Sequence, residues 1–456
     1  MNLRRPSLIA LLTLAAFTVA PTVAEAGSAR RTRRPAPIAN GGTISSLKSD
    51  ESVQAALAAT PAGGTLRLPF GAFRTALVID RPMTVVADPR GTRLDAKGLG
   101  RAAIEVRPGV VGVAVHGVVV SASDTDGMTV GAGCDGLRVS RSTFERCLGD
   151  GLNVARSADV RVEGCVFDRN GGDGLDLDAV GGVVTGCTFR ENGGAAVRLA
   201  GEDVALTTSS SNGGAEGVVF EGARLTAMRL TFRGTRLLAR FAATSDTCAF
   251  ERCDGRDVAT LATTEEGSTY ARVVGNRVAG TSEDAVILRG TWHTVEGNSL
   301  GRVLGSAVVG DGLSLRVADN TTLSTAANGI RIRGMGDTVE GNVLGPCGAD
   351  AIVLEGVAHL VARNVVRDGN GTGLVLDGAF HQAVANRITN VPGAGIRLEG
   401  DDCLLEANRL ERAGLEGIVV AAGRDNQLRA NAIARCGGRG LADDGTDTVL
   451  ERNRID

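Results

Sequence analysis

"DAIVLEG" at residues 350–356, "TGLVLDG" at 372–378 and "AGIRLEG" at 394–400 are versions of one short pattern, each beginning 22 residues after the one before. In each, apolar residues alternate with other residues ahead of a glycine, which is typical of a short β-strand that ends at a turn. The same pattern occurs upstream as "DGLDLDA" from residue 173. The sequence is therefore built from repeated units that contain strands.

Asparagine recurs with the same spacing, every step being 22 residues apart from one of 23. It occupies positions 276, 298, 320, 342, 364, 386, 408, 431 and 453. A unit of this length with about three short strands has the size of one coil of a right-handed parallel β-helix, whose coils stack about 4.8 Å apart. The stacked asparagines then form a hydrogen-bonded ladder. We predict an all-β chain folded as a single right-handed parallel β-helix, a solenoid of about 17 to 19 coils.

The N-terminal residues carry features of a different kind. Two arginines precede a short apolar run, which predicts a signal peptide over residues 1–26 and an exported protein, secreted or periplasmic. A basic, proline-containing tract predicts a disordered linker over residues 27–43. Residues 44–75 are expected to form a capping helix and a first strand, and residues 76–456 the coils. No later apolar stretch reaches 18 residues, so no membrane span is expected.

The composition limits the partners of this protein. The formal net charge is -3, with 49 basic and 52 acidic residues, and this near-balance argues against a nucleic-acid partner. Aromatic residues make up only 3% of the chain, which leaves few rings on which a sugar could stack. Of the nine cysteines, Cys165 and Cys187 are 22 residues apart and should lie on adjacent coils, either bridged or as small inward side chains.

The segment that follows the linker resembles a known family. "SVQAALAATPAGGTLRLPFGAF" (52–73) and "LVIDRPMTVVAD" (77–88) are similar to the N-terminal module of the pectin-lyase-like superfamily, and the later repeats resemble NosD-type β-helix proteins. The resemblance covers residues 44–456 and implies the right-handed parallel β-helix fold. The superfamily includes polysaccharide lyases, glycoside hydrolases, uronan epimerases and members without known catalysis, so the fold alone does not select an activity.

Alternation within residues 172–178 places Asp176 and Asp178 on the outer surface, with Asn153 one coil earlier and Arg198 one coil later. In the resembling lyases and epimerases, outward residues of this kind hold calcium or neutralise a uronate. The resemblance thus implies a catalytic role for Asp176, Asp178 and Arg198, a substrate-binding role for Asn153, and Ca²⁺ as a cofactor if the protein is a lyase. The alternative is an exposed charged face whose ion pairs contribute little. Acids also recur at the bend before the strand, as at Asp173, where they are expected to cap backbone groups.

A second outward surface is expected in the C-terminal half, where every second residue of each strand faces solvent. Aliphatic residues such as Ile287 and Val309 lie there beside charged residues of both signs. A ribbed surface of this kind suits contact with a polysaccharide or with another protein surface. The candidate substrate-binding residues on it are Arg331, Arg333, Glu355, Asp377, Arg397 and Glu399.

Asp337, His359, His381 and Cys403 each lie five residues before a ladder asparagine, so they should stack on four successive coils. Imidazole and thiolate ligands suit copper or zinc, which makes these residues a candidate metal site. The alternative is a stack of buried side chains whose hydrogen bonds go to the backbone.

Three absences weigh against catalysis: short coils leave no loops to wall a groove, aromatic residues are few, and lysine occurs only at positions 48 and 97. The leading hypothesis is a secreted, non-catalytic β-helix surface for carbohydrate or protein contact, with no cofactor expected. The first alternative is a polysaccharide lyase, glycoside hydrolase or uronan epimerase that acts on an acidic polysaccharide. The second is periplasmic copper handling. The sequence does not indicate an oligomeric state.

Overall fold

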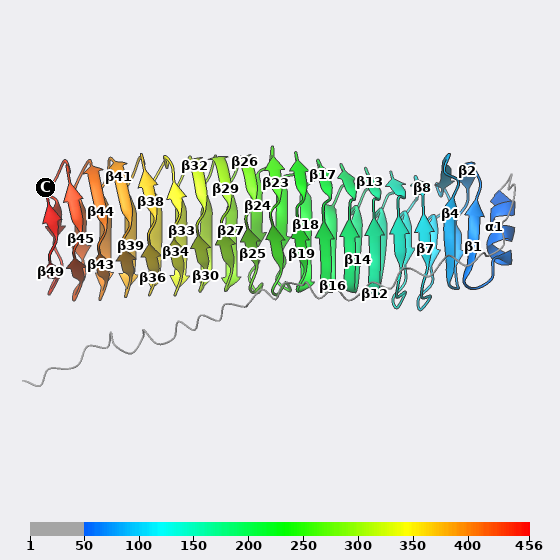
Figure 1. The fold of residues 1–456 in the computed structure, drawn as a ribbon, viewed down its shortest axis with the longest axis horizontal. Helices are drawn as coiled ribbons and strands as arrows, with labels where there is room; N and C mark the ends of the chain where they lie inside the picture. The colour runs from blue at the N-terminus through cyan, green and yellow to red at the C-terminus, as the bar shows by residue number, and fades with distance from the viewer. Residues whose placement is uncertain (1–49) are drawn as a thin grey trace, which may run out of the picture. The chain divides into compact units, whose positions relative to one another are not determined.

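The computed structural model describes residues 50–456, and the predicted signal peptide and linker lie outside this range. The described residues form an all-β, right-handed parallel solenoid of about 18 turns, which confirms the predicted fold (Figure 1). Helix α1 (Asp50–Ala59) precedes the first strand and buries Val53 and Leu57, as the sequence predicted. Within residues 50–456, no helix has the length and apolar content needed to cross a membrane.

Each coil contributes three strands, and each strand pairs in parallel with its counterpart one coil later. One coil consists of β27 (Val286–Thr291), β28 (Thr294–Glu296) and β29 (Ser299–Val303). These strands pair with β30 (Val308–Leu313), β31 (Arg316–Ala318) and β32 (Thr321–Thr325) of the next coil. Three strand columns therefore run along the solenoid, and we call them the first, second and third columns in the order of these strands (Figure 1).

The first column carries the candidate sites. Its strands from the N-terminal third onward are β9 (Met128–Val130), β12 (Leu152–Glu163), β14 (Leu175–Thr185), β16 (Ala195–Thr207), β18 (Glu216–Ala223), β21 (Leu237–Phe241), β24 (Thr260–Thr264), β27, β30, β33 (Ile330–Met335), β36 (Ile352–Val357), β39 (Leu374–Ala379), β42 (Ile396–Asp401), β45 (Ile418–Ala422) and β48 (Leu441–Asp443). In β12, β14 and β16 the first and second strands of the coil merge into one long strand.

Inward side chains from the three columns form one continuous apolar core along the axis. Because residues of successive coils lie about 4.8 Å apart, like side chains stack on one another. Phe144, Phe167 and Phe189 stack with ring centroids 5.4 and 5.0 Å apart. The nine cysteines are free thiols and all except Cys436 are buried, which fits small inward residues rather than bridges.

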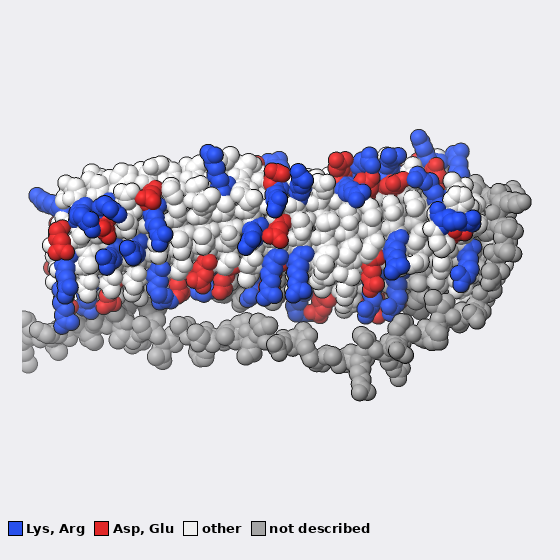
Figure 2. Space-filling model, turned by 45° about the horizontal axis from the view of Figure 1, so that its top comes forward, with Lys and Arg blue, Asp and Glu red and all other residues white. Residues whose placement is uncertain are grey.

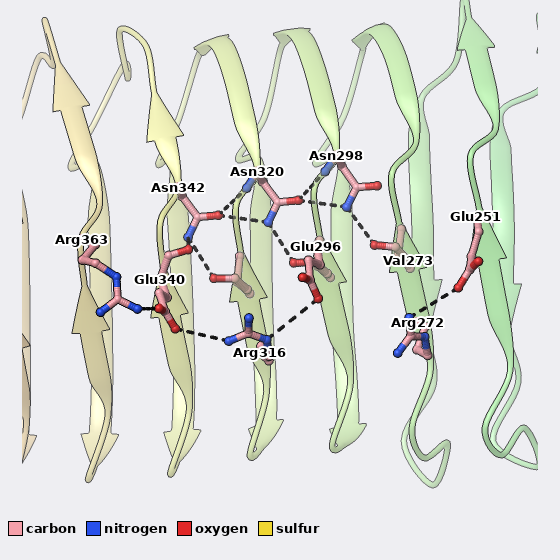
Figure 3. A network of polar contacts seen from close by, with 12 residues as sticks. Glu251, Arg272, Val273, Glu296, Asn298, Arg316, Asn320, Glu340, Asn342 and Arg363 are labelled. Carbon is pink, nitrogen blue, oxygen red and sulfur yellow. Dashed lines mark hydrogen bonds and ion pairs between the residues drawn. The ribbon is translucent and has the colours of Figure 1, made fainter. Parts of the chain in front are cut away.

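The predicted asparagine ladder is present at the corner between the second and third columns (Figure 3). Asn298 Nδ2 donates to Asn320 Oδ1 at 2.9 Å and to the Val273 carbonyl at 2.8 Å. The backbone N–H of Asn298 also donates to Asn320 Oδ1, at 3.0 Å. The same contacts repeat up to Asn453, so the ladder provides partners for buried backbone groups at this corner.

A shorter ladder that the sequence analysis missed lies at the corner after the third column. Asn170 Nδ2 donates to Asn192 Oδ1 at 3.0 Å, and both side chains are buried. Only two asparagines take part, so no long periodic pattern marks this ladder in the sequence.

Charged side chains follow the same periodicity on the outside of the second column. Arg316 lies between Glu296 and Glu340, with N–O distances of 4.0 and 3.4 Å, and Glu340 also contacts Arg363 (Figure 3). Figure 2 shows that acidic and basic side chains gather in mixed groups separated by uncharged surface. These exposed pairs balance the charge of the solenoid but contribute little individually to its stability.

Candidate functional site

The predicted site lies on the outer face of the first column, between β9 and β21. Parallel register places Asn153, Asp176 and Arg198 in one stripe on successive coils. Leu175 and Leu177 of the same strand are fully buried. The sequence therefore predicted both the stripe and the directions of its side chains correctly.

The acids at the bend before each strand cap the next coil. Asp126 Oδ1 accepts the backbone N–H of Asp150 at 2.8 Å, and Asp150 Oδ1 accepts that of Asp173 at 2.6 Å. Asp173 Oδ1 in turn accepts the N–H of Ala195 at 2.6 Å. These contacts confirm the structural role that was predicted for the bend acids. They also line one edge of the site with carboxylates.

The guanidinium of Arg198 contacts two carboxylates, one from the preceding coil and one from the following coil. Its Nε donates to Asp173 Oδ2 at 2.7 Å, and its Nη1 pairs with Glu221. Glu221 lies one coil beyond the predicted residues, in line with Ala200 and Asp178. Sequence reasoning missed it, although its outward position in the strand "EGVVFEGA" could have indicated it.

Among the acids of this face, Asp176 and Asp178 have no side-chain hydrogen-bond partner within the described residues, and Asp176 has a raised pKa. The nearest arginine in its stripe, Arg198, is turned to other carboxylates. Burial, with the negative charges of Asp150 and Asp173, raises the pKa of Asp176 to about 6, although the charge of Arg198 opposes this shift. Near neutral pH this carboxyl therefore exists in both protonation states and can donate or accept a hydrogen bond.

The other two predicted residues flank Asp176. Asn153 Nδ2 donates to Asp150 Oδ2 at 3.1 Å, which orients the amide along the face. Asp178 points outward and is half-buried. The structure thus gathers all four residues on one face but pairs Arg198 with neither Asp176 nor Asp178.

The face continues toward the C-terminus with Arg240, which pairs with Glu216 at 2.8 Å and with Glu265 at 2.9 Å. Carboxylates nevertheless outnumber arginines on it. The acids are Asp126, Asp150, Asp173, Asp176, Asp178, Glu216, Glu221 and Glu265, and the arginines are Arg198, Arg240 and Arg156, which lies in the bulge of β12 opposite Asp178. This surface should repel a polyanion and attract cations.

Two depressions of the described residues lie away from this face. One is a narrow apolar gap of about 10 Å³ beside Phe189 and Phe232. The other is a shallow surface depression of about 240 Å³ lined by Arg302, Ser324 and Asn370. The candidate surface around Asp176 is therefore a ribbed sheet face rather than one of these hollows.

The second predicted surface also faces outward from the first column, but its charges largely neutralise one another. Glu355 accepts from Arg331 at 3.1 Å and from Arg333 at 2.7 Å. Arg397 pairs with Glu399 two residues later in its own strand. Asp377 is exposed, and its carboxylate has no hydrogen-bond or ion-pair partner within residues 50–456.

The predicted metal residues stack in one buried stripe, in which each side chain accepts a backbone N–H from the coil before. His359 Nδ1 accepts the N–H of Asp337 at 3.3 Å, and His381 Nδ1 accepts that of His359 at 3.3 Å. Cys403 Sγ accepts the N–H of His381 at 3.4 Å. The imidazole rings are parallel, with centroids 5.0 Å apart. The stripe is thus a second hydrogen-bonded ladder with mixed side chains.

The remaining ring nitrogens of this stripe are also occupied. His359 Nε2 lies 3.1 Å from the Glu355 carbonyl, and His381 Nε2 lies 3.1 Å from that of Asp377, so both rings are assigned the Nε2–H form. Burial lowers the pKa of His381 to about 4. Within the described residues, no group of three or more His, Cys, Asp or Glu side chains is placed to hold a metal ion. In this arrangement the stripe does not fit a copper or zinc site.

Family models match three parts of the chain. The right-handed β-helix region matches residues 96–213 and 372–456, and the family described as periplasmic copper-binding protein (NosD) matches residues 244–402. The comparison with curated protein sequences finds no match.

Solved structures similar to this chain share its architecture at low sequence identity. The periplasmic alginate epimerase AlgG is 12% identical, covers 59% of this chain and 77% of its own, and has a TM-score of 0.48. The tailspike protein of E. coli bacteriophage HK620, solved with a pentasaccharide, is 14% identical, with coverages of 91% and 76% and a TM-score of 0.41. The PL6 family alginate lyase AlyGC is 8% identical, with coverages of 90% and 99% and a TM-score of 0.33.

The family matches and the solenoid geometry lead to the same classification. The chain is a right-handed parallel β-helix repeat protein of the pectin-lyase-like type.

Proposed function

We propose that this chain is an exported protein that binds carbohydrate on the outer face of β12, β14 and β16. The observation that carries this proposal is Asp176, a half-buried carboxyl without a protein partner and with a pKa of about 6. Such a group, beside the Asn153 amide and the Arg198 guanidinium, offers donors and acceptors for sugar hydroxyls. The flat face fits an extended glycan laid across several coils.

The charge of this face favours a neutral glycan. Eight carboxylates surround three arginines, and two of these, Arg198 and Arg240, are already paired with acids. An acidic polysaccharide would meet electrostatic repulsion unless a cation such as Ca²⁺ bridged the two sets of carboxylates. The proposed ligand is therefore a neutral oligosaccharide, and the function proposed first is contact without catalysis.

One observation favours glycoside hydrolysis as a second candidate. Asp176 and Asp178 lie two residues apart on the same side of β14, which sets their Cα atoms about 6.6 Å apart. Inverting glycoside hydrolases hold their two carboxyl groups about 6.5–9.5 Å apart, and a carboxyl with a pKa near 6 suits a general acid. In this role Asp176 would protonate the leaving oxygen and Asp178 would activate a water.

The test is an array of neutral and acidic oligosaccharides, followed by titration of each hit. We expect the wild-type protein to bind neutral glycans and the Asp176→Ala/Asp178→Ala variant to lose that binding. Asp254→Asn, an exposed acid on the third column, is the matched control and should bind normally. Unchanged glycan binding by the double variant would show that the binding site lies elsewhere on the protein. Release of reducing ends from a hit would support the hydrolase, provided that Asp176→Asn abolishes it.

A further inference from the structure

Six successive coils each expose one large apolar side chain near the corner between the first and second columns. These side chains are between 37% and 54% exposed. They are Tyr270, Trp292, Leu313, Met335, Val357 and Phe380, and we call them the aromatic ridge. The ridge contains the one tryptophan and the one tyrosine of the sequence. A continuous apolar strip of this kind is typical of a contact surface.

The corner does not need these aromatic side chains. Tyr270, Trp292 and Phe380 have φ angles of 50°, 57° and 60°, in the left-handed region that disfavours bulky residues. Elsewhere along the solenoid the same corner position is held by Thr247 and Asp402, with the same backbone conformation. The aromatic rings therefore add nothing that the turn requires, and they are not buried in the core.

The geometry of the rings distinguishes a packing surface from a sugar-stacking platform. Tyr270 and Trp292 are parallel within 8°, with centroids 5.1 Å apart, so each ring covers a face of the other. A pyranose stacks on an open ring face, and here a face of each ring is already taken. Apolar edges arranged in a straight line instead suit interdigitation with another protein surface.

We propose that the aromatic ridge is the dimer interface of this protein and that its occupant is the same ridge of a second copy, running antiparallel. The charges beside the ridge indicate that a second copy of the chain binds it. The outward residues next to it, in coil order, are Glu265, Arg289, Asp311, Arg333, Glu355 and Asp377. Except for the last, their signs alternate from one coil to the next.

A two-fold axis between the coils of Leu313 and Met335 makes this pattern self-complementary. It sets Arg289 opposite the partner's Glu355, and Asp311 opposite the partner's Arg333. By symmetry each pair occurs twice, so four of the six positions meet an opposite charge. Arg333 and Glu355 also pair within each copy, so at the interface these charges would form one network with Arg289 and Asp311 of the partner copy. Only Glu265 and the partner's Asp377, at the two ends, carry like charges. In the apolar strip the same axis sets Trp292 against the partner's Val357, and Tyr270 against the partner's Phe380.

The size of the ridge sets the expected affinity. Five coil steps of about 4.8 Å make it about 24 Å long. Together with the adjoining charged stripe, it lies at or below the roughly 800 Å² per partner of a standard interface. We therefore expect a reversible dimer with a dissociation constant on the order of micromolar. The interface is separate from the proposed carbohydrate contacts on β12, β14 and β16, because Arg198 lies four coils before Ile287 of the ridge region. Only Glu265, at one end of the ridge, belongs to both charged surfaces.

Sedimentation velocity of the purified protein over a concentration series tests the dimer. We expect concentration-dependent dimerisation, weakened at least tenfold by Trp292→Ser and by Met335→Asp. Leu323→Asp alters a leucine of the third column that is 70% exposed, more than any ridge residue, and should leave the association unchanged. Circular dichroism verifies that each variant is folded. A protein that stays monomeric, or ridge variants that associate like the wild type, would overturn the proposal.

Cysteine cross-linking tests the antiparallel register. Thr291 and Val357 occupy the same column three coils apart, and the two-fold axis brings Thr291 of one copy to Val357 of the partner subunit. We expect a disulfide-linked dimer when Thr291→Cys and Val357→Cys proteins are mixed, and none from either protein alone. Cross-linking of either single variant with itself would indicate a different arrangement and contradict the proposed axis.

Discussion

Asp176 and Arg198 are direct neighbours in the parallel register of β14 and β16, yet they form no ion pair. The guanidinium of Arg198 is bound instead to Asp173 and Glu221. Asp176 is largely buried and is left with like charges on the coil before and at its own bend, and burial together with these charges raises its pKa. The unpaired state of the Asp176 carboxyl therefore results from the binding of Arg198 to other carboxylates.

Asp176→Asn should stabilise the protein at neutral pH. The pKa of Asp176 is raised from 3.8 to about 6, so the folded state favours the protonated form. The stability that this form contributes is complete below pH 3.8 and is lost as the pH rises through 6. After discounting for solvent screening, we expect a gain of about 1–2 kcal/mol at pH 7.5 and none at pH 3.5. Chemical denaturation at the two pH values measures the difference.

Asp178→Asn is the control for this measurement, because it removes a charge from the same strand. A stabilisation by Asp176→Asn that is equal at both pH values would mean that ionisation of this carboxyl is not its cause.

The structural features that follow the 22-residue repeat could be predicted from the sequence, and those that do not follow it could not. A 22-residue repeat fixes which residues are stacked, so the asparagine ladder, the inward Leu175 and the outward Asp176 follow from spacing alone. Periodicity does not say which of two nearby acids Arg198 will reach, because that depends on side-chain torsions and on the bend at Asp173. The aromatic ridge escaped detection because its members are divided between two adjacent positions of the repeat, as Trp292 and Leu313 are.

Leu175→Ala and Leu177→Ala should each lower the free energy of unfolding by about 2–5 kcal/mol. Both side chains are fully buried, and neighbours on the coils above and below prevent the cavity from collapsing. Leu148→Ala is the matched control because Leu148 is 72% exposed, and it should change stability by less than about 0.5 kcal/mol. Equal effects at the buried and exposed positions would contradict the stacked core.

Asn364→Leu should destabilise the fold by several kcal/mol. Asn364 Oδ1 accepts both the backbone N–H and the side-chain Nδ2 of Asn342, and its own amide donates to Val339 and Asn386. A leucine leaves these buried groups without partners, at about 1–3 kcal/mol each. Asn370→Leu, on the surface, serves as the control. Thermal unfolding distinguishes the two variants, and a Tm for Asn364→Leu close to that of the wild type would contradict the ladder.

His381 should make the protein sensitive to acid. Its pKa is lowered from 6.5 to about 4 because burial disfavours the imidazolium. The unfolded chain therefore binds a proton between pH 6.5 and 4 that the folded chain does not, and stability falls as the pH falls through this window. His381→Asn keeps an acceptor for the His359 N–H and removes the titration. We expect the free energy of unfolding of this variant to fall less than that of the wild type between pH 7 and pH 4.5. Parallel pH profiles would contradict the assignment.

Asp337→Asn should raise the free energy of unfolding, although it removes a charged residue from a polar ladder. Asp337 Oδ1 accepts the N–H of Leu315 at 2.7 Å, but its Oδ2 is fully buried without a donor and lies 3.2 Å from His359 Nδ1. An asparagine keeps the first contact and directs an N–H₂ donor at the imidazole nitrogen. Satisfying one buried group and removing one buried charge should add about 1–3 kcal/mol at pH 7.5.

The control for this last prediction is Asp337→Leu, which shares the branching at Cγ but is larger and has no hydrogen-bonding atom. It resembles Leu315 in the neighbouring coil, so it packs in the stripe, but it leaves the Leu315 N–H without an acceptor. We expect it to be less stable than Asp337→Asn by about 1–3 kcal/mol, as measured by chemical denaturation. If Asp337→Asn were instead less stable than the wild type, the carboxylate would have a partner that the ladder geometry does not provide, and a cation held by Asp337 and His359 would be the first to test.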